Sequence, residues 1–213
     1  RQTRVLPDLS VPANSERWYR IEVAKRRLFY TLARLGLTPA TPAADAPPTG
    51  PVFEFLADLP GMAPVMTGHR NGVITLNVAE ADDDERARRR VVLHEPYRTL
   101  LGHLRHESGH YYWDSLISAQ PDRLTAFRSL FGDDTLDYGQ ALSQHYAQHA
   151  SGQQPSWQGD YVSAYATAHP WEDWAETWAH YLHMVDLLET AAAYSTRVVV
   201  PGDSPDEAEE VGS

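Results

Sequence analysis

The 213-residue chain contains no cysteine. Disulfide bonds and zinc sites built from thiolates are therefore excluded from it, and any zinc ligands must be histidine or carboxylate side chains. The lack of cysteine is compatible with a reducing compartment, and we expect a cytoplasmic location. The chain also lacks any run of about 18 apolar residues, so we expect no transmembrane helix and no membrane partner.

Basic residues are scarce compared with acidic ones. Lysine and arginine number 18 against 29 aspartate and glutamate, which gives a formal net charge of -11. Because the phosphates of nucleic acid repel such a surface, we expect no nucleic-acid partner. Part of the acidity is local, and we predict that residues 201–213 form an acidic disordered tail. Its acidic residues are Asp203, Asp206, Glu207, Glu209 and Glu210.

The remaining composition is that of a globular protein, with 42% hydrophobic residues, six tryptophans and eleven tyrosines. Residues 1–37 are predicted to form an extended lead-in and a helix packed on the main domain, because apolar residues recur at helical spacing from Ser15 onward. Residues 38–51 contain five prolines and are predicted to be a loop. Residues 52–200 are the main domain.

The most informative stretch is Leu100–Ile117, which contains His106-Glu107-Ser108-Gly109-His110, a match to H-E-x-x-H. On a helix, residues four apart lie on one face, so His106 and His110 can direct two imidazole nitrogens at one metal ion. Glu107 follows the first histidine, where a carboxylate can take a proton from water at the metal. Chance produces such a motif in roughly 0.03 of chains of this length and composition. The alternative is an amphipathic helix whose histidines share a face without a metal.

A catalytic zinc site needs a third protein ligand and an open position for water. The segment His169–His183, HPWEDWAETWAHYLH, offers five side chains of suitable chemistry. They are Glu172, Asp173, Glu176, His180 and His183. All except Asp173 fall on one face of the helix predicted for Trp171–Ala193, which Pro170 begins. The alternative is an acidic stripe on an ordinary amphipathic helix.

These two segments together resemble the gluzincin branch of the zincin metallopeptidases. The resemblance implies that Glu172 is the third ligand and that Glu176 is the acid that orients His106. The stretch YATAHPWEDWAETW is similar in layout to the catalytic domain of anthrax lethal factor, which implies that Tyr165 faces the metal. There its hydroxyl can stabilise the oxyanion of a tetrahedral intermediate. The alternative is that Tyr165 is an ordinary core tyrosine.

Most of Leu6–Ala193 resembles a bacterial family of zinc-binding metallopeptidases. The resemblance implies an α+β, zincin-like catalytic domain over residues 52–200, mostly helical with a small sheet. It also implies a Zn²⁺ cofactor and a peptide or protein substrate. The oligomeric state is not indicated.

The function predicted from these observations is zinc-dependent hydrolysis of peptide bonds, with Glu107 as general base. Strand Val73–Val78 precedes the motif helix, where zincins place an edge strand that pairs with extended substrate. Two other functions stay open: a zinc-bound interaction module without catalysis, and a hydrolase of non-peptide amides. His103, one turn before His106, can support the ligands, replace one of them or belong to the core. We expect it to line the pocket or the core.

Overall fold

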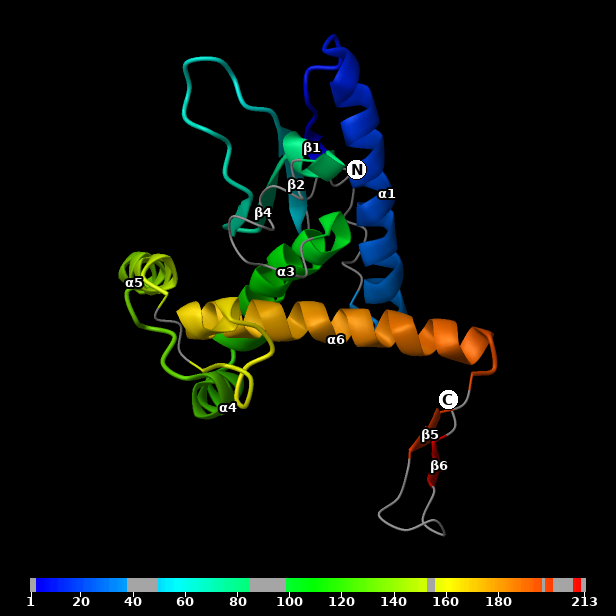
Figure 1. Cartoon of the computed structure of the whole chain (residues 1–213), viewed down its shortest axis with the longest axis vertical. Coiled ribbons are helices and arrows are strands. Elements are labelled where there is room, and N and C mark those ends of the chain that lie inside the picture. Colours follow the sequence, from blue (N-terminus) through cyan, green and yellow to red (C-terminus); the bar gives the residue numbers. More distant parts are fainter. Residues whose placement is uncertain are drawn as a thin grey trace. The chain divides into compact units, whose positions relative to one another are not determined.

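The computed structural model describes residues 3–37, 50–84, 99–152, 156–196, 198–200 and 209–211. The chain divides into two compact units, Arg1–Ala179 and His180–Ser213. The first unit holds a four-stranded sheet and most of the helices (Figure 1). This architecture confirms the predicted α+β class, mostly helical with a small sheet.

The helices occupy most of the segments that the sequence predicts. They are α1 (Pro12–Arg34), α3 (Leu100–Trp113), α4 (Pro121–Phe131), α5 (Tyr138–Ala150) and α6 (Pro170–Ala193). Short turns connect some of them: the 3₁₀ turns η1 (Val78–Ala81) and η3 (Tyr165–Ala168), and the π-helical turn η2 (Asp114–Ser118). Helix α1 begins three residues earlier than predicted because Pro12 occupies its first turn, where a missing N–H costs nothing.

The sheet has the strand order β1-β2-β4-β3. Its strands are β1 (Thr3–Val5), β2 (Val52–Leu56), β3 (Gly68–Arg70) and β4 (Val73–Asn77). Strands β1, β2 and β4 run parallel, and β3 returns antiparallel to β4 through the Asn71-Gly72 turn. The prediction that Val73–Val78 is an edge strand is therefore wrong. Strand β4 lies between β2 and β3, and the two edges of the sheet are β1 and β3. Each of these edge strands has three residues, too few to show a periodic pattern.

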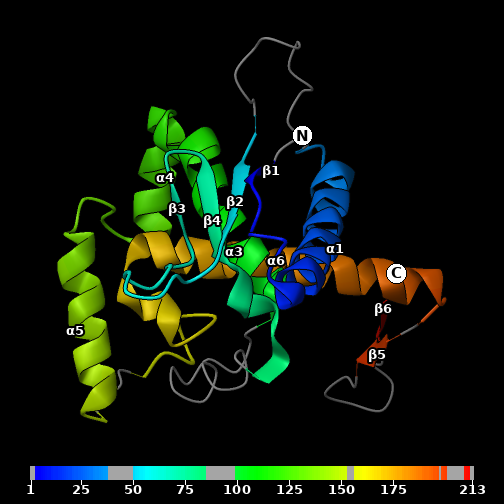
Figure 2. The same ribbon diagram turned by 90° about the horizontal axis from the view of Figure 1, so that it is seen from above.

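One face of the sheet forms the core. Phe53 pairs in register with Ile74 and Phe55 with Leu76, and all four side chains are fully buried. The Phe29 ring of α1 contacts the Phe53 ring at 5.9 Å between centroids, which places α1 on this face (Figure 2). Helix α3 packs against α1. The motif helix thus rests on a core of apolar side chains.

Two further expectations differ from the structure or lie outside it. The hydrophobic pattern of residues 160–168 predicts a helix, but in the structure only Tyr165–Ala168 form a helical turn, of the 3₁₀ type. Within the predicted acidic tail, Glu209–Val211 form strand β6, which pairs antiparallel with β5 (Val198–Val200). Residues 201–208, 212 and 213 of that tail lie outside the described residues, as does most of the Pro-rich loop 38–51. None of the described helices is long and apolar enough to cross a membrane.

Candidate metal centre

The two motif histidines are carried by α3, which begins with a side-chain cap. The Thr99 hydroxyl accepts a hydrogen bond from the Gly102 amide at 2.9 Å, which satisfies one of the free N–H groups of the first turn. Leu104, on the apolar side of the helix, is fully buried. One turn apart on the other side, His106 Nε2 and His110 Nε2 lie 3.2 Å from each other. Both rings therefore present the same nitrogen to one point.

The middle residues of the motif bring α6 close to α3. A methyl group on Gly109 would lie 3.0 Å from the Ala175 backbone and 3.1 Å from the Trp178 ring, so only glycine leaves this spacing undisturbed. Trp174 Nε1 donates to the Gly109 carbonyl at 2.9 Å, and Trp178 Nε1 donates to the Ser108 hydroxyl at 3.1 Å. Figure 1 shows the resulting crossing of the two helices.

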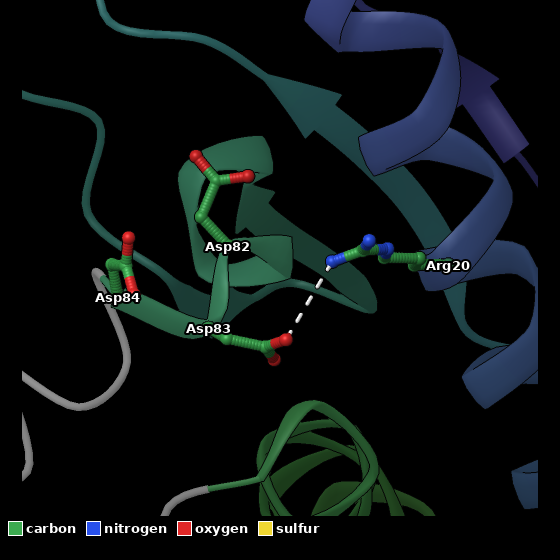
Figure 3. A pocket seen from close by; sticks show the side chains of 4 residues that line it. All are labelled: Arg20, Asp82, Asp83 and Asp84. Atoms are coloured by element: carbon green, nitrogen blue, oxygen red, sulfur yellow. Dashed lines mark ion pairs between the residues drawn. The ribbon is translucent and has the colours of Figure 1, made fainter.

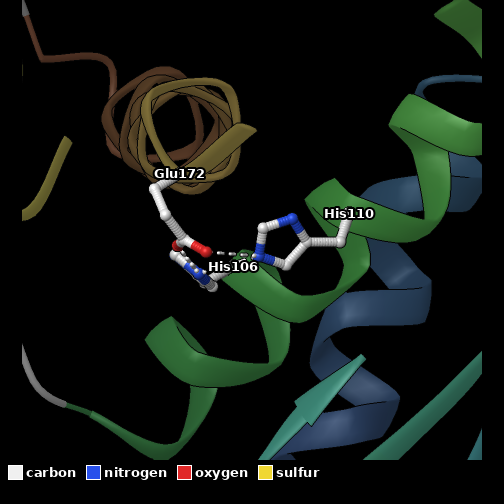
Figure 4. A group of neighbouring side chains, drawn as sticks. All are labelled: His106, His110 and Glu172. Atoms are coloured by element: carbon white, nitrogen blue, oxygen red, sulfur yellow. Dashed lines mark hydrogen bonds and ion pairs between the residues drawn. The ribbon is translucent and has the colours of Figure 1, made fainter. Parts of the chain in front are cut away.

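The close crossing places Glu172, in the first turn of α6, against both histidines. Its Oε2 lies 3.0 Å from His106 Nε2, and its Oε1 lies 3.5 Å from His110 Nε2. Figure 4 shows the carboxylate descending from α6 toward the two rings. Glu172 is 1% exposed, so this carboxylate is held away from water. Among the described residues, His106, His110 and Glu172 are the one group of histidine and acidic side chains that could hold a metal ion.

The spacing of these atoms fits a zinc ion. Three ligands placed about 2.0–2.1 Å from a tetrahedral ion are roughly 3.3 Å from one another. His106 Nε2 lies 3.0 Å from Glu172 Oε2 and 3.2 Å from His110 Nε2, both close to that value, and the second carboxylate oxygen, Oε1, lies 3.5 Å from His110 Nε2. Glu172 Oε2 is also buried without a hydrogen-bond partner among the described residues, although a buried carboxylate oxygen normally has one. A bound cation accounts for both observations.

The charges of the group favour the same interpretation. Burial raises the pKa of Glu172, but the close contacts with His106 and His110 outweigh it and hold that pKa well below its usual range. Burial lowers the pKa of His106, but the close contacts with the carboxylates of Glu172 and Glu176 raise it well above 6.5. Without an ion, the ionised Glu172 carboxylate therefore favours a protonated, positively charged His106 ring beside it. A divalent cation bound between the three side chains would supply the positive charge in place of that proton.

Glu176 supports His106 from the side opposite the group. Its Oε1 lies 2.7 Å from His106 Nδ1, and its Oε2 accepts a hydrogen bond from the Ser163 hydroxyl at 2.7 Å. A carboxylate at Nδ1 keeps the proton there and leaves Nε2 as a lone-pair donor. The structure thus brings Glu176 to the histidine that the gluzincin resemblance implies.

Glu107 lies beside the group and is 8% exposed. Its Oε2 is buried and has no hydrogen-bond partner among the described residues. Burial raises the pKa of Glu107 above 4.5, and the charges of Glu172 and Glu176 add to this while the two histidines oppose it. An unpaired carboxylate beside a metal-binding group is available to exchange a proton with a bound molecule.

Two tyrosines reach the group, and one of them was missed by the sequence analysis. The Tyr165 ring lies 6.0 Å from the His106 ring, between centroids, at the start of η3. The Tyr138 hydroxyl, from α5, donates a hydrogen bond to Glu172 Oε1 at 2.6 Å. Burial raises the pKa values of both phenols, so both stay protonated near neutral pH. Tyr138 lies 34 residues from Glu172, and no motif spacing connects the two.

His69 was also missed. It lies in edge strand β3, and its ring is nearly parallel to that of His110 with 6.3 Å between centroids. The Gly72 amide donates to His69 Nε2 at 3.1 Å. Burial, with a smaller effect of His110, lowers the pKa of His69 to about 4, so the ring is neutral. In the sequence, the one sign of this placement is the Asn71-Gly72 turn, which predicts a hairpin whose first strand would contain His69.

The other candidate ligands are not part of the three-residue group. His103 Nδ1 lies 3.4 Å from the fully buried Glu80 Oε2, so His103 pairs with Glu80 and does not join the three-residue group. Asp173 is buried and accepts a hydrogen bond from the Thr177 hydroxyl at 3.5 Å. His180 and His183 lie in the second compact unit.

A pocket of about 470 Å³ lies elsewhere, between α1 and the chain after η1 (Figure 3). It is lined by Arg20, Asp82, Asp83 and Asp84. Arg20 Nη1 lies 3.9 Å from Asp83 Oδ2 across it. Ion pairs as exposed as this one contribute little to stability, and the pocket contains none of the candidate site residues.

Comparison with known proteins identifies the family. Residues 14–211 match the model of a family described as "Putative zinc-binding metallo-peptidase", and the chain belongs to that family. Over 173 residues it is 51% identical to the uncharacterized proteins Rv2568c of Mycobacterium tuberculosis and Mb2598c of Mycobacterium bovis. The match covers 81% of this chain and 49% of each relative, so the chain spans about half the length of these relatives. No solved structure matches the chain.

Proposed function

We propose that this member of the zinc-binding metallopeptidase family is a peptidase of the gluzincin type, with His106, His110 and Glu172 as zinc ligands. The observation that carries the proposal is the buried convergence of His106, His110 and Glu172, whose Nε2 atoms and carboxylate oxygens lie 3.0–3.5 Å from one another, beside Glu107, whose buried Oε2 has no hydrogen-bond partner among the described residues. Bound zinc supplies a Lewis acid that acidifies water and polarises a carbonyl group. Peptides or proteins are the proposed substrates.

The chain's own residues supply the proton transfers. Glu107 accepts a proton from the attacking water and delivers it to the amine that leaves. Its buried position keeps bulk water from competing for that proton. Glu176 holds the proton of His106 at Nδ1 and fixes the orientation of the ring, so Nε2 stays directed at the metal position.

Tyr165 is the proposed donor to the developing oxyanion. Its ring lies next to that of His106, and its raised pKa keeps the hydroxyl protonated. A protonated phenol can donate a hydrogen bond to an oxygen as that oxygen gains charge, which lowers the barrier of the chemical step.

Substrate backbone is proposed to pair with β3. This strand forms the edge of the sheet next to the motif helix, and the ring of His69 within it contacts those of His110 and Trp171. An exposed edge offers free backbone N–H and C=O groups to an extended peptide. The pairing strand is thus β3 rather than the interior strand β4.

Two alternatives make different predictions. A zinc-bound interaction module would use the same ligands and the aromatic packing around them, such as the Trp171 ring 3.9 Å from that of His110. A structural zinc has no need of an unpaired carboxylate beside it, so Glu107 favours catalysis. A hydrolase of non-peptide amides would keep Glu107 and cleave no peptide.

The test is digestion of a peptide library by the wild-type chain and by Glu107→Gln, with zinc content measured for both. The wild type is expected to cleave, and Glu107→Gln is expected to keep its zinc and lose a factor on the order of 10²–10⁴ in rate. Glu16→Gln, an exposed carboxylate on α1, is the control and should cleave normally. Equal rates for Glu107→Gln and wild type would refute the mechanism. Zinc binding by a wild type that cleaves no peptide would favour the alternatives.

A further inference from the structure

We propose that Tyr138 is a positioning residue of the metal centre: its hydroxyl holds one oxygen of Glu172 and thereby links the exposed helix α5 to metal binding. The inference rests on the proposed function, because it takes Glu172 as a ligand. It goes beyond that function by assigning a role to a residue and a helix outside the motif segments.

The hydrogen bond from Tyr138 makes the two carboxylate oxygens of Glu172 different: one binds the phenol and the other faces His106. Oε1 accepts from the Tyr138 hydroxyl at 2.6 Å and lies 3.5 Å from His110 Nε2. Oε2 lies closer to its histidine, 3.0 Å from His106 Nε2, and has no hydrogen-bond partner among the described residues. The phenol thus engages Oε1 and leaves Oε2 as the oxygen free to bind the ion.

This contact also restricts rotation of the carboxylate. The terminal torsion of a glutamate is broad, so an unsupported carboxylate can present either oxygen or both. A hydrogen bond to an ionised acceptor is among the stronger kinds, and the 2.6 Å between the Tyr138 hydroxyl and Glu172 Oε1 is the short distance typical of such a bond. Partners of this type behind a metal ligand typically change metal affinity by about 10–100-fold.

The position of Tyr138 supports a specific role rather than general packing. It is the first residue of α5, fixed by the Asp137 side chain, which accepts from the Gln140 amide at 2.8 Å. The Tyr138 ring packs against those of His169 and Trp171, at 5.4 and 5.6 Å between centroids. Although the residue is 37% exposed, its hydroxyl turns inward to the 1% exposed Glu172 rather than outward to water.

Helix α5 buries none of its side chains. Besides Tyr138, it contacts η3 through His145, whose Nδ1 lies 3.4 Å from the Thr167 hydroxyl and whose ring lies 5.8 Å from that of Tyr165, between centroids. A helix without a buried face gains little stability from apolar burial. Since coupling between two events is reciprocal, an ion that fixes Glu172 should also fix the first turn of α5 through Tyr138.

The experiment measures the zinc dissociation constant of the full chain by competition with a chromogenic chelator. Tyr138→Phe removes the hydroxyl and keeps the ring, and it should weaken zinc binding by about tenfold or more. Tyr161→Phe is the matched control, because it removes the same hydroxyl group from another partly exposed tyrosine, 39% exposed, that makes no contact with Glu172. It should bind zinc as the wild type does.

Hydrogen exchange of the α5 amides in the wild type, with and without zinc, gives a second measurement that does not depend on a variant. Zinc should slow exchange in the first turns of α5. Equal zinc affinity of Tyr138→Phe and wild type, or α5 exchange that zinc leaves unchanged, would overturn the inference. A wild type that binds no zinc would instead overturn the proposed function.

Discussion

Gly109→Ala tests whether the close crossing of α3 and α6 sets the geometry of the metal centre. The added methyl group would lie 3.0 Å from Ala175 Cα and 3.1–3.2 Å from two atoms of Trp178. Nonbonded carbon atoms prefer a separation of about 3.5–4.0 Å, so α6 must move by about 0.5 Å or more relative to α3. Ala175 is one turn from Glu172, and the movement carries the carboxylate with it.

The effects on stability and on metal binding should differ. Overpacking costs about 1–3 kcal/mol, whereas replacing a helical glycine by alanine gains about 1 kcal/mol. The net loss of unfolding free energy should therefore be about 0–2 kcal/mol. Metal sites tolerate ligand displacements of only about 0.2 Å, so zinc affinity should fall by a factor of about ten or more.

Chelator competition measures the affinity, and urea unfolding of the zinc-free chain measures the stability. Gly159→Ala is the control, because a methyl group there meets no atom within 4 Å. That variant should bind zinc as the wild type does. If Gly109→Ala kept full zinc affinity, the reasoning from the helix crossing to the metal site would be refuted.

Three further predictions concern charge and metal. Glu22→Gln should lower the unfolding free energy by about 1 kcal/mol at pH 7, because hydrogen bonds from Lys25 and Thr3, at 2.6 and 2.8 Å, outweigh burial and lower the pKa of Glu22 below 4.5. That stability is present above pH 4.5 and is lost as the pH falls through the folded-state pKa, so the difference in urea unfolding should shrink steadily as the pH is lowered below 4.5; a pH-independent difference would contradict the assignment. Glu176→Ala should weaken zinc binding about 10–100-fold without abolishing it, because His106 loses its partner at Nδ1, and unchanged affinity in the chelator assay would exclude that role. Removing zinc from the wild type should lower the melting temperature, because the ion binds the folded state; a melting curve insensitive to chelator would contradict a resident ion.

The parts of the fold that the sequence predicts are those specified locally. The helices begin where a cap or a proline marks a first turn, as at Pro121, Asp137 and Pro170. The H-E-x-x-H spacing places two histidines on one helical face whatever the rest of the chain does. Glu172 and Glu176 required more than local information, and only the family resemblance singled them out among five candidates.

The parts that the sequence did not predict depend on contacts between distant segments. Strand β3 has three residues and gains its identity from pairing with β4, so no periodic signal exists for it. Tyr138 reaches Glu172 only because α5 and α6 meet in space. Gly109 gave no sign in the sequence that it governs the distance between two helices, since its role depends on the Ala175 and Trp178 atoms opposite.

Elemental analysis of purified protein tests the central assignment most directly. The wild type, Glu172→Ala and the exposed-site control Glu16→Ala are compared after equilibration with zinc and removal of free metal. We predict about one zinc per chain for the wild type and the control, and loss of zinc from Glu172→Ala, because two histidines alone do not complete the site. A wild type without zinc, or a Glu172→Ala variant that retains a full equivalent, would contradict the account.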